Sequence, residues 1–185
     1  MGKTTEIFHT GEMSALMYLE DRIQNSWGWH AMLKLQRLLE VISVIIVVLE
    51  LGIVVVCRYI FEINVLGYDE IILIGAYWMY FIGSSYATYE ESHVSADVLS
   101  IFVSERTQKK LNLFSKAVQV LVGLPLVYLS FDLVRWDILI DPRTIDWGIP
   151  YLIPHTGIFV GFLMMLFYNC VYLMRDYHRV KDFKN

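Results

Sequence analysis

Histidine offers the widest range of chemistry in this sequence, because it can act as a general base, a proton carrier or a metal or haem ligand. The axial ligands of a b-type haem would have to face each other from the middle of apolar segments, and no two histidines are placed in that way. Zinc, nucleophile and phosphate-binding motifs do not occur either. We therefore expect neither an enzyme nor a bound cofactor or metal. The histidines are His9, His30, His93, His155 and His178.

Glu50 is an ionisable residue midway along an apolar run. A charge at the centre of a bilayer costs about 2.5–3.5 kcal/mol on insertion scales, so Glu50 must be uncharged, paired or turned towards protein. Two interpretations stay open: a polar contact with a partner helix or an ion path, and a neutral acid hydrogen-bonded within its own helix bundle. Glu40 and Lys116 lie nearer a membrane surface, and we expect their side chains to reach it.

Arg58 and Glu70 flank the short connection "RYIFEINVLGYDEI". An acid at the start of a helix and a base at its end both suit the helix dipole. The two residues are therefore either ordinary interface anchors or a pair that fixes the hairpin between two helices.

Small residues gather in the segment that Glu70 opens. Gly83 and Ala87 have the small-x-x-x-small spacing, and Gly75 lies further towards Glu70. Faces of this kind let two helices approach closely inside a membrane. The partner is either another helix of this chain or an external subunit. Both interpretations stay open, because a bundle of four short helices has little interior to bury.

The stretch "EESHVSADVLS" follows this segment without a glycine or proline. His93 and Asp97 are four residues apart and can touch on a helix surface. We predict an amphipathic helix that lies along the membrane interface, with a solvated loop as the alternative. Its apolar stripe consists of Val94, Val98, Ile101 and Phe102.

All of these residues have to be positioned by membrane-spanning elements. The 185-residue chain is 56% hydrophobic with a mean hydropathy of +0.49, and its net charge of -4 argues against nucleic-acid binding. Four apolar segments are each near the roughly 20 residues that cross a bilayer as a helix. We predict an all-α integral membrane protein with spans at about 38–59, 71–89, 111–131 and 148–174 and an expected kink at Pro125.

The basic residues predict the orientation of these spans. They cluster before the first span, between the second and third, and after the fourth, whereas only Arg58, Arg135 and Arg143 lie on the other side. The positive-inside rule then places both termini in the cytoplasm. Residues 1–37 form a cytoplasmic segment that could contain a short interfacial helix, 38–174 form the four-span domain, and 175–185 form a tail.

The order of these features resembles a known family. The stretch "CRYIFEINVLGYDEIILIGAYWMYFIGSSYATYEESHVSADVL" is similar to the small membrane subunit, DctQ-like, of tripartite ATP-independent periplasmic (TRAP) transporters. The matching elements are R-Y-x-F after the first span, Glu70 at the start of the second, "WMYFIGSSYA", and the exit His93–Val94–x–x–Asp97. The start of the fourth span, "IPYLIPHTGIFVGFLMM", is similar too. Glu90 and Glu91 stand where the family often has basic residues.

The resemblance implies a subunit of the bacterial inner membrane that pairs with a large multi-span subunit carrying the substrate and sodium sites. A periplasmic binding protein would deliver an organic acid to this pair. The small subunit would act as a scaffold without substrate contacts of its own. Two other hypotheses stay open on the residues alone: an anchor or haem subunit of an oxidoreductase, and a free-standing four-helix channel or exporter.

Overall fold

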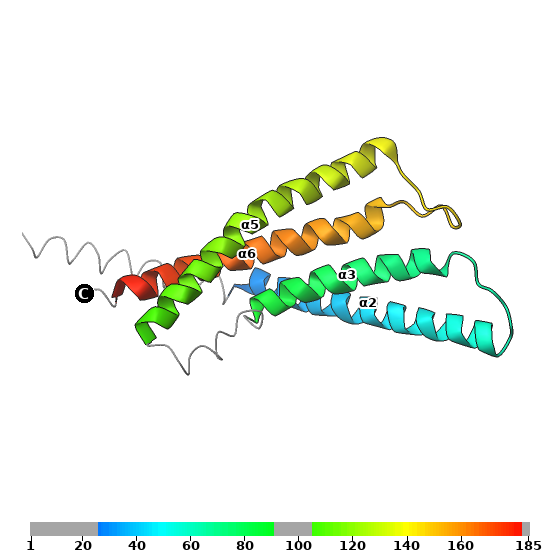
Figure 1. Cartoon of the computed structure of the whole chain (residues 1–185), viewed down its shortest axis with the longest axis horizontal. Coiled ribbons are helices and arrows are strands. Elements are labelled where there is room, and N and C mark those ends of the chain that lie inside the picture. The colour runs from blue at the N-terminus through cyan, green and yellow to red at the C-terminus, as the bar shows by residue number, and fades with distance from the viewer. Residues whose placement is uncertain (1–25, 91–104, 183–185) are drawn as a thin grey trace, which may run out of the picture.

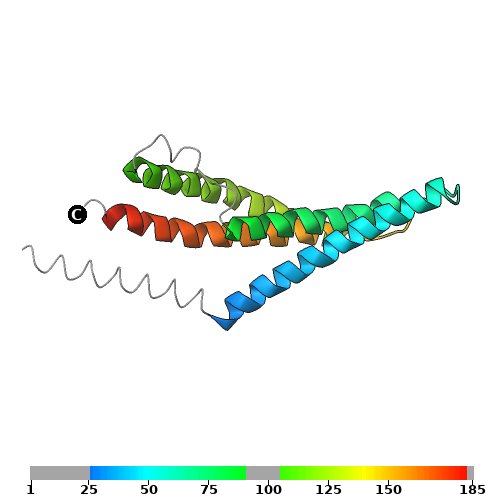
Figure 2. The ribbon, with the colours of Figure 1, turned by 90° about the horizontal axis from the view of Figure 1, so that it is seen from below.

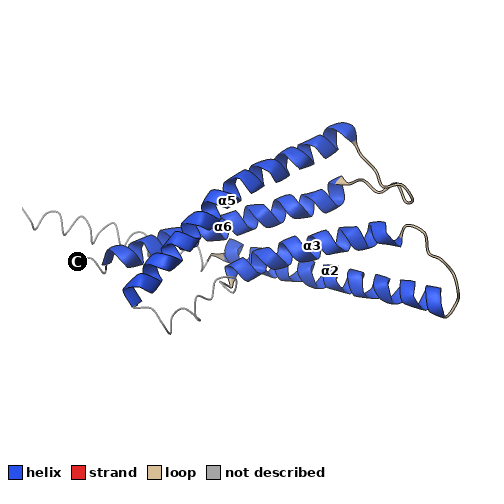
Figure 3. Cartoon of the chain, in the orientation of Figure 1, coloured by secondary structure: helices blue, strands red, loops and turns tan. Residues whose placement is uncertain are grey.

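The computed structural model describes residues 26–90 and 105–182, and the regular secondary structure in these ranges is helical (Figure 3). Each of the four helices is long and apolar enough to cross a membrane, which confirms the prediction of an all-helical chain with four candidate spans. The helices are α2 (Trp27–Tyr59), α3 (Tyr68–Tyr89), α5 (Glu105–Ile140) and α6 (Leu152–Asp182).

The helix ends differ from the ends of the apolar segments because capping and backbone conformation, rather than hydropathy, decide where a helix stops. The helix α2 already begins at Trp27, where the hydroxyl of Ser26 accepts a hydrogen bond from the Trp29 amide at 3.1 Å. The helix α6 begins at Leu152 rather than at Gly148, which has a φ of +65°. The helix α5 continues through Pro125 as one helix.

The helices form a row in the order α5–α6–α3–α2, in which each helix packs against its neighbours (Figure 1). Residues 60–67 join α2 to α3 and residues 141–151 join α5 to α6, and both connections lie at one end of the row, called the loop end here (Figure 2). The start of α2 and the end of α6 lie at the opposite end, called the terminal end. The central pair α3 and α6 therefore links two sequential hairpins.

Glycines allow close approach at each boundary of the row. A Cβ at Gly75 of α3 would lie 2.7 Å from the Val47 side chain of α2, and one at Gly161 of α6 would lie 2.6 Å from Cβ of Phe81 on α3. Gly123 of α5 faces α6 in the same way. Small residues at such contacts are typical of membrane helices, whose association gains little from the hydrophobic effect.

The row leaves little apolar core. The buried hydrophobic side chains of the described residues lie on α2, α3 and α6, while α2 and α5 expose most of their aliphatic surface. A membrane or a protein partner must cover that surface in the cell. The buried hydrophobic residues are Trp29, Ile82, Tyr168 and Tyr172.

Candidate functional site

A contact between the two connections holds the loop end together. Glu70, in the first turn of α3, is only 8% exposed. Its two carboxylate oxygens accept hydrogen bonds from the backbone amides of Asp146 at 2.8 Å and Trp147 at 3.0 Å. The indole of Trp147 in turn donates to the backbone carbonyl of Leu66 at 3.1 Å. These residues, Glu70, Leu66, Asp146 and Trp147, are called the loop-end contact here.

Gly67 makes the loop-end contact sterically possible. It has a φ of +75°, a left-handed conformation that side chains other than glycine rarely adopt. A Cβ at this position would collide with the indole of Trp147 and lie 2.7 Å from Cβ of Asp146. The backbone at Gly67 therefore has to be bare for the two connections to meet.

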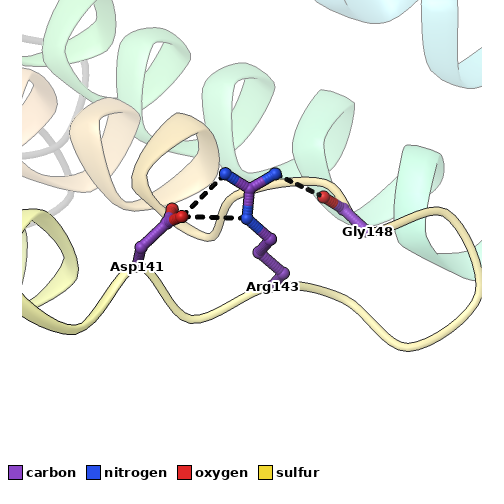
Figure 4. Close-up of polar contacts among 3 residues, drawn as sticks. All are labelled: Asp141, Arg143 and Gly148. Atoms are coloured by element: carbon purple, nitrogen blue, oxygen red, sulfur yellow. Dashed lines mark hydrogen bonds and ion pairs between the residues drawn. The ribbon is translucent and has the colours of Figure 1, made fainter.

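The α5–α6 connection has a defined conformation of its own. The Thr144 amide donates to the Ile149 carbonyl at 2.9 Å, and the Ile149 amide donates to the Thr144 hydroxyl at 2.8 Å. Figure 4 shows the guanidinium of Arg143 bonded to the Asp141 carboxylate at 2.7 and 2.9 Å and to the Gly148 carbonyl at 3.4 Å. The loop thus presents its backbone amides to Glu70 in a fixed geometry.

Two further contacts bind the start of α6 to its neighbours. Nδ1 of His155 lies 2.6 Å from a carboxylate oxygen of Asp137, which is buried on α5. The indole of Trp78 on α3 donates to the carbonyl of Ile153 at 3.0 Å, and its ring lies over Gly157. These contacts extend the loop end of the row from α3 through α6 to α5.

A buried network of side chains joins three helices towards the terminal end. The amide nitrogen of Gln36 on α2 donates to the Ser85 hydroxyl of α3 at 2.9 Å. The Tyr168 hydroxyl of α6 donates to the amide oxygen of Gln36 at 2.6 Å. The residues Gln36, Ser85 and Tyr168 are called the terminal-end network here. No pattern in the sequence singles out these residues, because they are far apart in the chain and each type is common beside apolar segments.

Aromatic rings pack around this network. Trp29 of α2 lies edge-on to Tyr168 at 5.4 Å and to Tyr89 at 6.0 Å between ring centroids. The Tyr172 hydroxyl donates to the Tyr89 carbonyl at 2.7 Å. Trp29 is thus a buried contact among α2, α3 and α6.

Glu50 lies on the same face of α2 as Ser43 and Val47, which pack against Gly75 of α3. Its side chain is half-buried, and Oε2 is enclosed without a hydrogen-bond partner among the described residues. Glu50 therefore faces the interior of the α2–α3 hairpin.

The small residues of α3 partly face this chain as well. A Cβ at Gly83 would lie 3.3 Å from the carboxylate of Glu40 on α2, as Gly75 faces Val47 of the same helix. Ala87 is half-buried on α3. Gly75 and Gly83 therefore both face α2 of this chain, and a contact of these small residues with an external subunit stays a prediction.

Two expectations for charged residues change. Arg58 and Glu70 do not form the pair considered from the sequence: the guanidinium of Arg58 lies 6.0 Å from the centroid of the Tyr59 ring, while Glu70 binds the α5–α6 connection. Lys116 does not extend to a surface; it is buried, with its ammonium 5.1 Å from the centroid of the Tyr172 ring.

The predicted interfacial helix lies outside the described residues. This applies to His93, Asp97 and the stripe Val94, Val98, Ile101 and Phe102, whose interpretation stays a prediction. Within residues 26–90 and 105–182, no three His, Cys, Asp or Glu side chains come together in a group that could hold a metal ion.

The geometry defines a class of protein: a multi-pass helical membrane protein in which long-range polar contacts join the helices and loops to one another. Comparison with known families assigns it more closely. Residues 47–179 match the family described as "Tripartite ATP-independent periplasmic transporters, DctQ component". The chain therefore belongs to the DctQ family and is a transporter component of the inner membrane, not an enzyme. No curated protein matches it.

Proposed function

We propose that this chain is the small scaffold subunit of a TRAP transporter, bracing a large membrane subunit that carries out sodium-coupled uptake of an organic acid. The family supplies the frame, a tripartite transporter with a large membrane subunit and a periplasmic binding protein. The binding protein would deliver the acid to the large subunit, while the present chain holds no substrate contact.

One observation carries the scaffold role: the hydrogen bonds that described side chains make to residues distant in sequence join helices and connections of this chain to one another. Glu70 binds the α5–α6 connection, Gln36 and Tyr168 join α2 to α6, and Asp137 joins α5 to His155. A row braced in this way keeps broad helix faces available on both sides, which suits a subunit that stiffens a larger neighbour.

The test is reconstitution with and without this chain. The cognate large subunit and binding protein are placed in liposomes with an inward sodium gradient, and uptake of a panel of labelled organic acids is measured. We expect uptake of at least one acid only when this chain is present and the gradient is intact. Uptake by the large subunit alone at the full rate would contradict the scaffold role.

The proposed orientation puts both termini in the cytoplasm and the loop end in the periplasm, on the distribution of basic residues. Cys57 and Cys170 are first replaced by serine. A cysteine at Ile145, which is 97% exposed at the loop end, should then react with an impermeant thiol reagent added to intact cells. A cysteine at Lys110 should not react. The reverse pattern would overturn the orientation.

The amphipathic helix proposed for residues 93–102 can be tested with spin labels. Labels at Val94 and Val98 should be shielded from a water-soluble relaxation agent, whereas a label at Ser95 should be accessible. Equal accessibility along the segment would favour a solvated loop.

A further inference from the structure

A groove with a volume of about 580 Å³ runs between α3 and α5 and has α6 as its floor. It exists because α3 and α5 each pack against α6 but lie on opposite sides of it in the row (Figure 1). The half nearer the loop end is apolar, and Val122, Leu126 and Phe162 line it. Gly123, in the wall formed by α5, lines the groove beside them.

The half nearer the terminal end is polar. Thr88, Lys116, Gln119 and Asn169 contribute to the lining there, which includes one cation and no acidic side chain among the described residues. Asn169 is only 7% exposed, and its amide oxygen is enclosed without a hydrogen-bond partner in the described part of the chain. A buried polar group without a hydrogen-bond partner costs about 1–3 kcal/mol. A partner that brings a hydrogen-bonding group to Asn169 would therefore stabilise the groove.

The exposed face of α2 differs from the groove because it is uniformly aliphatic midway along the helix. Its exposed residues midway along the helix are branched aliphatic side chains such as Ile45, Val48 and Leu49, and no polar side chain interrupts them there. Hydrocarbon tails satisfy such a surface completely. The groove, with small residues and an amide that has no partner, has the composition of a contact between protein helices instead.

We propose that the groove between α3 and α5 receives one face of a transmembrane helix from the large subunit, with a hydroxyl or amide side chain of that helix bonded to Asn169. This inference rests on the proposed function. Asparagine, glutamine, serine or threonine on the partner can both donate to and accept from the Asn169 amide.

Two pairs of substitutions test the groove against the aliphatic face. Val122→Trp fills the groove, while Val48→Trp adds the same bulk to the exposed face of α2; the two valines are 50% and 61% exposed, so the isolated chain can accommodate either change. Asn169→Leu removes the groove amide. Asn112→Leu removes an amide whose oxygen is also enclosed without a partner among residues 26–90 and 105–182 but which lies outside the groove lining.

The measurement is the amount of large subunit that co-purifies with each variant in mild detergent, normalised to the amount of folded variant. We expect Val122→Trp to lower it at least tenfold and Asn169→Leu to lower it about three- to twentyfold, the range of hydrogen bonds between membrane helices. Val48→Trp and Asn112→Leu should match the wild type. A photo-crosslinking residue at Val122 should capture the large subunit, and one at Val48 should capture lipid.

The outcomes separate the groove from the scaffold role. If the wild-type chain does not bind the large subunit at all, the proposed function fails and the groove proposal fails with it. If the wild type binds and Val122→Trp and Asn169→Leu bind equally well, only the groove proposal is overturned. Capture of phospholipid or of a second copy of this chain at Val122, without the large subunit, would likewise assign the groove to another occupant.

Discussion

The loop-end contact and the terminal-end network both join helices that are distant in sequence, but they do so with different atoms. In the loop-end contact, side chains bind backbone: Glu70 accepts from the amides of Asp146 and Trp147, and Trp147 donates to the carbonyl of Leu66. In the terminal-end network, side chains bind side chains, from Gln36 to Ser85 and Tyr168.

The difference has a consequence for which residues can be exchanged. A contact between a carboxylate and backbone amides requires the acidic residue and the correct path of the opposite loop. It does not require particular side chains on that loop. A network of side chains depends on every member, because each supplies one donor or acceptor. The loop end should therefore be sensitive at few positions and the terminal end at each of its three.

Removing the carboxylate should have the largest effect. Glu70→Ala leaves two backbone amides of the α5–α6 connection without their acceptor, and hydrogen bonds to charged groups contribute about 1.5–3 kcal/mol. We expect a loss of about 3 kcal/mol in the free energy of unfolding, measured by SDS titration in mixed micelles. Asp69→Ala, at the exposed neighbouring acid, is the control. Equal losses for the two variants would mean that Glu70 acts only through the helix dipole.

A smaller loss in the free energy of unfolding is expected at Gly67, where the contact leaves no space for a side chain. Gly67→Ala places a methyl group against the indole of Trp147 in a left-handed conformation and should cost about 2 kcal/mol. Gly148→Ala shares the positive φ but has no heavy atom within 4 Å of the added carbon. The difference between the two unfolding free energies isolates the collision. If it is zero, Trp147 moves aside at no cost and the loop-end contact is loose.

The terminal-end network should lose less from one deletion, since the other bond remains. Tyr168→Phe removes the hydroxyl that donates to Gln36 but leaves the bond between Gln36 and Ser85. Hydrogen bonds between membrane helices average about 0.6 kcal/mol and reach about 1.7, so we expect a loss of about 1 kcal/mol. Tyr128→Phe, on the exposed side of α5, should have no effect on the unfolding free energy. A Tyr168→Phe protein as stable as the wild type would show that aromatic packing alone holds this end.

The contrast also explains what the sequence could predict. The four spans follow from long apolar runs, and Glu70 and Gly75 were singled out because an acid at a helix start and a glycine inside a span are visible locally. The role of Glu70 was not predictable, because its partners are the backbone amides of residues 146 and 147. Every residue except proline has such an amide, so no residue type marks these two as partners. Gln36 and Tyr168 were missed because only the packing of α2 against α3 and of α3 against α6 brings them together.

The smallest effect is the most telling test of the comparison. Asp146 contributes its backbone amide to Glu70, whereas its exposed carboxylate makes no hydrogen bond or ion pair with the described residues. Asp146→Ala keeps that amide and the Cβ that lies beside Gly67, so it removes a charge at the loop end without touching the contact. Exposed substitutions of this kind change the free energy of unfolding by less than about 0.5 kcal/mol.

Asp146→Ala and Glu70→Ala each delete one carboxylate from the same contact, and SDS titration of the two variants side by side should separate them by about 2 kcal/mol or more. Combining Asp146→Ala with Glu70→Ala should add nothing to the loss seen with Glu70→Ala, because a side chain that takes no part in the contact cannot be coupled to it. A loss of 1 kcal/mol or more with Asp146→Ala would mean that the loop end, like the terminal end, depends on side chains from both partners.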